Sequence, residues 1–419
     1  MMKLPESLRA LRHRDFRLFA SGQMISLIGT WMQMVAQSWL IYRLTGSATA
    51  LGVVTFIGQL PMLVLAPAGG LLADHIPTKR LLLGTQTAAM GLALFLGILT
   101  LSHHVQLWHV IAAAFLFGVV NAADNPGRQV FAAEVVPKDD LMNAIALNSS
   151  MVNGARILGP AIAGILVAFV GEGWCFLLNA ISYLAVIAAL LKLESRPKPS
   201  HRGLLSSPLQ RIAEGFSFAQ RCLPIRRLLL LLGLLSLLGT TYSVLMPIFA
   251  DRILRGGPRA LGLLMGTSGL GALAGAVSLM LRKKHDGLGT WVANSALLFG
   301  LSLFAFSFSR SLYFSAVLLI PVGYAFMVEM ASTNTLLQMM VPDGFRGRVM
   351  SLHMVMFLGM APLGGLLVSL LSRWLSSPAT VAVSGIGCIL GGILFLLGLP
   401  RWGREAKALE AHPTPVPQP

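Results

Sequence analysis

Three charged residues stand inside long apolar stretches of the sequence, where a charge needs a specific role. Asp124 and Glu329 are carboxylates, and Arg156 lies near the middle of another apolar stretch. A carboxyl group in a partly dry site can hold a proton, or it can pair with a nearby cation such as Arg128. An arginine in such a place can bind an anionic group or form a structural ion pair. We favour pairing over proton binding for the carboxylates, and an anion-binding role for Arg156.

The elements that carry these residues are predicted to be membrane-spanning helices. The chain has 419 residues, of which 55% are hydrophobic and 11% are charged, whereas about 25% are charged in a typical soluble domain. A helix of about 20 apolar residues crosses the hydrocarbon core of a bilayer. Twelve stretches qualify, near residues 16–44, 50–73, 81–102, 107–134, 141–169, 173–193, 226–250, 258–281, 288–309, 311–340, 345–371 and 378–400.

A polar connector over residues 194–225 divides these spans into two groups of six. The sequence therefore predicts an all-α polytopic membrane protein with two pseudo-symmetric six-helix bundles, 16–193 and 226–400, an arm over residues 1–15 and a disordered tail over 401–419. With the N-terminus inside, 25 of the 32 Lys and Arg residues fall on the cytoplasmic side. This asymmetry predicts that both termini are cytoplasmic and that the chain lies in a bacterial inner membrane.

The two halves are related in sequence. Val136-Pro137 and Val341-Pro342 stand 205 residues apart, and the same spacing pairs Gly118 with Gly323 and Asp124 with Glu329. Parallel halves of this kind place a binding site near the middle of the membrane between them. Arg156 pairs with Ala361 at this spacing, so the repeat does not account for the arginine, and we expect it to mark the substrate site.

The first predicted span carries a polar stripe at spacings of three and four, which is one face of a helix. The stripe comprises Gln23, Ser26, Thr30, Gln33 and Gln37. We expect it to line a central cavity, and hydrogen bonds between helices are the alternative. The candidate cavity residues are Arg156, Thr30, Gln33, Gln37, Gln59, Thr240 and Ser243.

Other classes of protein fit the sequence poorly. The formal net charge of +16 is explained by membrane orientation, so we expect no nucleic-acid partner. Three scattered cysteines share no metal-ligand spacing, and we expect neither a metal site nor a cofactor. The phosphate-binding loop of ATP-driven pumps is absent from the sequence, and no cluster of catalytic side chains suggests an enzyme. We expect the protein to be a monomer and an ion gradient to supply the energy for its activity.

Two motifs resemble those of the major facilitator superfamily. The loop from Gly69 to Arg80 is similar to the family's loop after the second helix, with matches at Gly70, Asp74, Lys79 and Arg80. The resemblance implies that these residues form a conformational latch. The segment from Gly154 to Gly164 is similar to the fifth-helix motif of the antiporters, and it is carried by Gly159, Pro160 and Gly164.

The segment from Asp124 to Pro160, with Asp140 and Asn143 in it, resembles the drug and siderophore efflux branch of this superfamily. The resemblance implies secondary-active efflux. We expect the chain to move a small amphiphilic molecule outward by alternating access, driven by proton entry. An arginine common in the fourth helix of drug antiporters is missing between Trp108 and Asn121, so proton coupling would need other groups. The alternative is a lipid or lysolipid flippase of the same fold.

Overall fold

The computed structural model describes residues 6–193, 216–282, 287–400 and 402, and this part of the chain contains helices and no strand. The chain divides into two compact units. The first comprises Met1–Gly203 with Ala250–Gly266, and the second comprises Leu204–Phe249 with Thr267–Pro419. The predicted connector 194–225 and tail 401–419 lie largely outside the described residues. Trp402 is an exception, since its buried indole N–H donates to the carbonyl oxygen of Pro224 at 3.1 Å.

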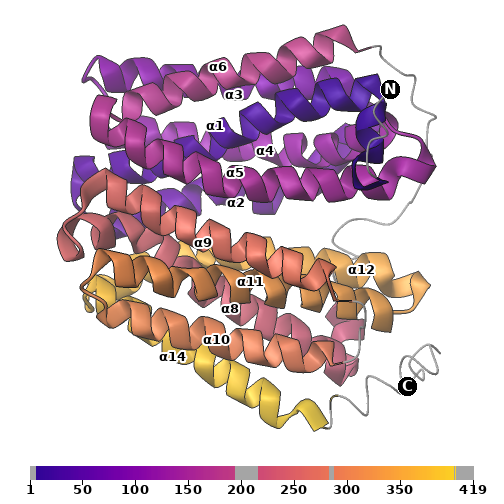
Figure 1. The fold of residues 1–419 in the computed structure, drawn as a ribbon, viewed down its shortest axis with the longest axis vertical. Coiled ribbons are helices and arrows are strands. Elements are labelled where there is room, and N and C mark those ends of the chain that lie inside the picture. Colours follow the sequence, from indigo (N-terminus) through magenta and orange to yellow (C-terminus); the bar gives the residue numbers. More distant parts are fainter. Residues whose placement is uncertain (1–5, 194–215, 283–286, 401, 403–419) are drawn as a thin grey trace. The chain divides into compact units, whose positions relative to one another are not determined.

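The first unit holds the six long helices α1 to α6, which run side by side (Figure 1). Helix α1 packs against α5 and α6, α2 packs against α4, and α3 packs against α4 and α6. Their bounds are α1 (Arg14–Thr45), α2 (Ala48–His75), α3 (Thr78–Leu101), α4 (Leu107–Glu134), α5 (Leu141–Val170) and α6 (Glu172–Lys192).

The second unit repeats this pattern of neighbours. Helix α8 packs against α13 and α14, and α10 packs against α11 and α14. The bounds are α8 (Leu223–Ile248), α9 (Gly257–Met280), α10 (Leu288–Phe308), α11 (Leu312–Met340), α12 (Asp343–Met354), α13 (Met360–Leu371) and α14 (Ser377–Leu397). The first part of α9, up to Gly266, belongs to the first unit. Two π-helical turns, Phe249–Ile253 and Val355–Gly359, interrupt the regular helices. The eleventh predicted span is therefore two helices joined by a π turn.

Eleven helices in the described part of the chain are long and apolar enough to cross a membrane. Helix α1 is long enough, with 32 residues, but it is not among the eleven. Charged residues at its start and the polar stripe along it lower its apolar character. The crossing of α1 thus stays a prediction, whereas the all-helical two-bundle architecture is confirmed.

A glycine at the same place in each unit shows the repeat in three dimensions. A Cβ atom on Gly118 of α4 would lie 2.2 Å from the carbonyl oxygen of Gly58 in α2. A Cβ atom on Gly323 of α11 would lie 1.8 Å from the carbonyl oxygen of Ser268 in α9. Only glycine lets two helix backbones approach this closely. The spacing of 205 residues therefore corresponds to an equivalent helix crossing.

The N-terminal arm is attached to the start of α5. A short 3₁₀ helix, Glu6–Arg12, precedes α1, and Ala10 is buried with its backbone N–H donating to Asn143 Oδ1 at 2.8 Å. Arg9 Nε and His13 Nε2 lie 2.9 and 2.7 Å from the two carboxylate oxygens of Asp140. The hydrogen bond from His13, followed by the charge of Arg9, lowers the pKa of Asp140 below its ordinary value of 3.8.

This lowered pKa gives the arm a specific pH dependence. Because the pKa of Asp140 is lower in the folded than in the unfolded protein, its ionised carboxylate contributes fully to the stability of the docked arm above pH 3.8. This contribution is lost as the pH falls through the lowered pKa of Asp140. We therefore expect the arm to stay docked at neutral pH and to detach only in strong acid. Hydrogen exchange of residues 6–13, corrected for intrinsic rates, measures this. Asp140→Asn should raise exchange there at neutral pH, and equal exchange in the variant and the wild type would contradict the assignment.

Candidate functional site

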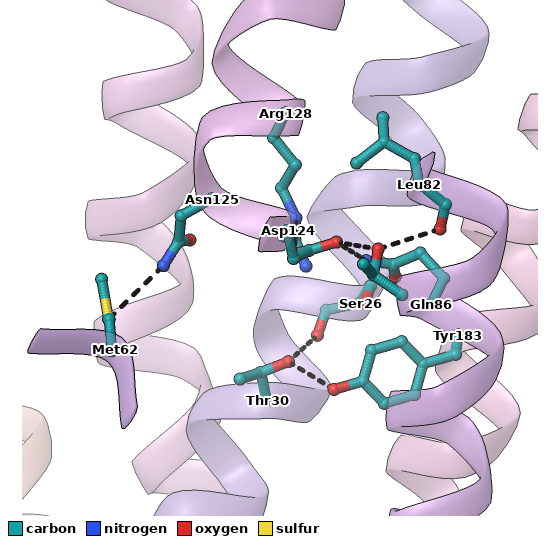
Figure 2. Close-up of polar contacts among 10 residues, drawn as sticks. Ser26, Thr30, Met62, Leu82, Gln86, Asp124, Asn125, Arg128 and Tyr183 are labelled. Carbon is teal, nitrogen blue, oxygen red and sulfur yellow. Dashed lines mark hydrogen bonds and ion pairs between the residues drawn. The ribbon is translucent and has the colours of Figure 1, made fainter. Parts of the chain in front are cut away.

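Asp124 is the centre of a buried polar network inside the first unit (Figure 2). Its side chain on α4 is 1% exposed. Thr85 Oγ1 and Gln86 Nε2, both on α3, donate to its Oδ1 atom at 2.6 and 2.8 Å. Arg128, one helical turn further along α4, places Nε 2.5 Å from the other oxygen. Two hydrogen-bond donors and one cation therefore converge on a single buried carboxylate.

The backbone of α4 helps to place this network. Pro126 lies inside α4 and has no N–H, so the carbonyl oxygen of Ala122 loses its helical partner. Helix α2 comes close to that oxygen, since a Cβ atom on Gly69 would lie 1.9 Å from it. Glycine and proline thus bring α2 against α4 directly beside Asp124.

The polar stripe of α1 contacts α6. Gln23, Ser26 and Gln33 are buried, and Gln33 Oε1 accepts from Asn179 Nδ2 at 2.6 Å. Thr30 Oγ1 donates to the carbonyl oxygen of Ser26 at 2.9 Å and lies 3.5 Å from the hydroxyl of Tyr183. For Gln33 and Thr30 these contacts are the interhelical hydrogen bonds that the sequence left open as the alternative to cavity lining.

The other candidate cavity residues are less enclosed. Gln37, Gln59 and Ser243 are half-buried, and the side chain of Thr240 lies outside what the structure describes. Their place in a cavity stays a prediction.

Arg156 lies against an aromatic ring. Its guanidinium carbon is 4.9 Å from the centre of the Trp31 ring, which allows a cation–π interaction. Gly159, one turn along α5, makes this possible, because a Cβ atom there would lie only 2.5 Å from Cβ of Trp31. Arg156 is half-buried. The fifth-helix motif therefore positions a cation and an indole side by side.

Glu329 has different surroundings from its repeat partner Asp124. It is 0% exposed, and Thr333 Oγ1 donates to its Oε1 atom at 3.1 Å. Its Oε2 atom has no hydrogen-bond partner, and no cation forms an ion pair with it within the described ranges. One repeat thus holds a paired carboxylate, and the other holds a buried carboxyl group that forms no ion pair with any cation of the described residues.

The residues of the predicted latch are described only in part. Gly70 and Asp74 lie in α2, but their side chains are outside what the structure describes. Lys79 Nζ donates to the carbonyl oxygen of Leu193 at the end of α6, and Arg80 is exposed. Gly164 packs against the backbone of Gly262, and Pro160 is buried in α5.

The sequence does not reveal the hydrogen-bond partners of Asp124 and Gln33. Thr85 and Gln86 on α3 and Asn179 on α6 are buried polar residues in apolar helices. A polar residue in an apolar span needs a hydrogen-bond partner inside the protein. That signal could have singled out all three, although it would not have named their partners.

Comparisons with known proteins agree with this architecture. The model of the transmembrane secretion effector family, a group of major facilitator transporters, matches residues 6–418. The staphyloferrin A transporter of Staphylococcus aureus is 26% identical over 384 residues, covering 90% of this chain and 95% of that protein. The enterobactin exporter of Escherichia coli is 26% identical over 400 residues, or 92% of each chain. The multidrug efflux pump Tap of Mycolicibacterium fortuitum is 26% identical over 384 residues, or 89% of this chain and 92% of the pump.

Solved structures support the fold. A crystal structure of a peptide transporter has a TM-score of 0.76 at 14% identity and covers 96% of this chain and 99% of its own. A bacterial homologue of the iron transporter ferroportin in the inward-facing state has a TM-score of 0.70 at 18% identity, covering 93% of this chain and 98% of its own. The family and these relatives are transporters and not enzymes, as predicted. The chain is a multi-pass membrane transporter, and it belongs to the transmembrane secretion effector family of the major facilitator superfamily.

Proposed function

We propose that this transporter exports a small amphiphilic molecule by alternating access and that proton entry drives the export. The observation that carries the proposal is the contrast between the two repeat-related carboxylates. Asp124 is paired with Arg128, whereas Glu329 is fully buried without a cation in the described ranges. A site of the first kind can hold a gate, and a site of the second kind can take up and release a proton.

The substrate class follows from the relatives and from Arg156. The relatives are a siderophore transporter, a siderophore exporter and a drug efflux pump, so a siderophore, a drug or a secreted metabolite is the substrate we propose. Arg156 beside Trp31 offers a cation and an apolar face, which suits an anionic molecule with an aromatic or apolar body. These relatives do not favour the alternative of a lipid flippase.

In this proposal the gate and the proton site work in turn. Asp124 and Arg128 keep α3 and α4 together on the predicted cytoplasmic side, through Thr85 and Gln86. Glu329 in α11 takes a proton when it is accessible from outside and releases it inside. The chain would act as a monomer in the bacterial inner membrane with both termini cytoplasmic.

The experiment measures flux in proteoliposomes under an imposed pH gradient. Carboxyfluorescein serves as an anionic probe and ethidium as a cationic one. We expect Glu329→Gln to lower proton-driven movement of the transported probe at least about tenfold, since glutamine cannot carry a proton. The same variant should keep probe exchange without a gradient and should unfold at the wild-type temperature. Full proton-driven flux in Glu329→Gln would remove this residue from the coupling mechanism.

A second prediction concerns Arg156. Arg156→Ala should weaken binding of an anionic substrate about tenfold or more, because one charge-assisted contact contributes about 1.5–3 kcal/mol. Binding of a cationic probe should change little. Thermal shift with a panel of anionic and cationic amphiphiles checks this, and Trp31→Phe is the matched variant for the ring. Equal losses of binding for the anionic and the cationic amphiphiles would mean that Arg156 has a structural role.

A further inference from the structure

Residues Ala250–Gly266 belong to the first compact unit, although α8 before them and the chain from Thr267 onward belong to the second. We call residues 250–266 the strap. It comprises the end of the π-helical turn, a short loop and the first part of α9. The chain therefore passes from one unit to the other just before Ala250 and returns just after Gly266.

Polar contacts hold the beginning of the strap to the end of α1. The hydroxyl of Tyr42 donates to Asp251 Oδ2 at 2.7 Å, and the guanidinium carbon of Arg252 lies 5.7 Å from the centre of the Tyr42 ring. Gly46 ends α1 with φ of +58°, and Arg252 Nη2 would lie 2.8 Å from a Cβ atom there. Arg252 thus lies over the C-terminal end of α1, where unpaired carbonyl groups favour a cation.

Close packing holds the other end of the strap to α5. A Cβ atom on Gly262 would lie 2.6 Å from Cα of Gly164, and one on Gly164 would lie 2.7 Å from Cα of Gly262. The guanidinium carbon of Arg259 lies 4.4 Å from the centre of the Phe169 ring. Both ends of the strap are therefore bound to the first unit by contacts of different kinds.

The backbone is irregular at the first of the two places where the chain changes unit, near Ala250. The turn Phe249–Ile253 is π-helical and carries Asp251 and Arg252, and Pro247 precedes it by two residues. π-helical turns often occur at functional positions. After the turn, Arg255 has φ of +53° and Gly257 has φ of +58°. Hinges are a few residues at the ends of elements that absorb large backbone changes, and this turn has that place in the chain.

We infer that Tyr42 and Asp251 form a lock that holds the strap on the first bundle and that must open in each transport cycle. The inference rests on the proposed alternating access, because a transporter that changes conformation must release such contacts. Tyr42, Asp251 and Arg252 are positioning residues in this scheme, and the π turn is the hinge. A lock of this kind sets how often the predicted outer end of the transporter opens, without touching the substrate.

Hydrogen exchange of the protein in lipid nanodiscs tests the lock without any substrate. Tyr42→Phe removes one hydroxyl, and Asp251→Asn removes the charge of the acceptor. We expect each variant to exchange about tenfold faster at the amides of residues 253–262, with no change in α3. Tyr313→Phe, at an exposed tyrosine in the first turn of α11, is the control and should exchange like the wild type. Unchanged exchange in the strap of both lock variants would overturn the inference.

Cross-linking tests whether the lock must open. Cysteines at positions 42 and 251, in a background with Cys175, Cys222 and Cys388 replaced by serine, are joined by a short reducible bifunctional thiol reagent. We expect flux of the transported probe to stop after cross-linking and to return after reduction. Full flux through the cross-linked protein would show that the strap need not move. If the wild type moves neither carboxyfluorescein nor ethidium, the proposed function fails with those probes, while hydrogen exchange still decides the lock.

Discussion

Asp124→Asn is expected to abolish transport and to lower the stability of the first bundle. The substitution keeps the shape of the side chain, so Thr85 can still donate to an oxygen at this position. It leaves Arg128 without its anion, and the Arg128 side chain is only 21% exposed. Removing one partner of a buried ion pair costs about 3–5 kcal/mol, because the remaining charge is uncompensated. Thermal unfolding in detergent and flux in proteoliposomes measure the two effects.

A double-mutant cycle separates the pair from the rest of the network. Arg128→Met removes the cation and keeps much of the apolar stem. If the ion pair is the main interaction, the double variant should be more stable than the sum of the two single effects predicts. Additive effects would show that Asp124 acts mainly through Thr85 and Gln86.

The repeat partner provides the matched control. Glu329→Gln removes a charge at the equivalent place of the second half, where no cation pairs with it in the described ranges. Its stability should therefore change little, in contrast to Asp124→Asn. A similar loss of stability in both variants would mean that the two carboxylates play the same structural role.

The architecture could be predicted well from the sequence because the bilayer limits the choices. In a hydrocarbon core every backbone group must be bonded within the segment, so long apolar stretches become helices. The predicted span 107–134 agrees with α4 at both ends, and most other predicted ends agree within a few residues. The π turn at Val355–Gly359 was missed, since the apolar pattern of that stretch contains no break.

The candidate site was predicted less well, because sequence spacing places residues on a helix face but does not name the helix opposite. The stripe on α1 predicts a cavity-facing surface, with hydrogen bonds between helices as the alternative. The structure bonds Gln33 to Asn179 and places Thr30 beside Tyr183, both on α6. Asp124 and Glu329 occupy equivalent positions, yet their partners differ because α3 supplies Thr85 and Gln86. Such partners depend on tertiary packing.

A second large effect on stability is expected from alanine at the two repeat-related glycines. The new Cβ atom would lie 2.2 Å from the oxygen of Gly58 for Gly118→Ala and 1.8 Å from the oxygen of Ser268 for Gly323→Ala. Both obstacles are backbone atoms, so the helices must move apart. Overpacking of this kind costs about 1–3 kcal/mol, occasionally more. Thermal unfolding in detergent should show a clear decrease in Tm for each variant.

Gly91 in α3 is the control for these variants, because a Cβ atom there would meet nothing within 4 Å. Gly91→Ala should keep or raise Tm, since alanine favours a helix interior over glycine by about 1 kcal/mol. The contrast separates the close approach of two helices from the general effect of adding a methyl group. A decrease in Tm in only one of the variants Gly118→Ala and Gly323→Ala would show that the two halves do not share an equivalent close helix crossing. Wild-type Tm in both would mean that neither helix pair packs as closely as the structure indicates.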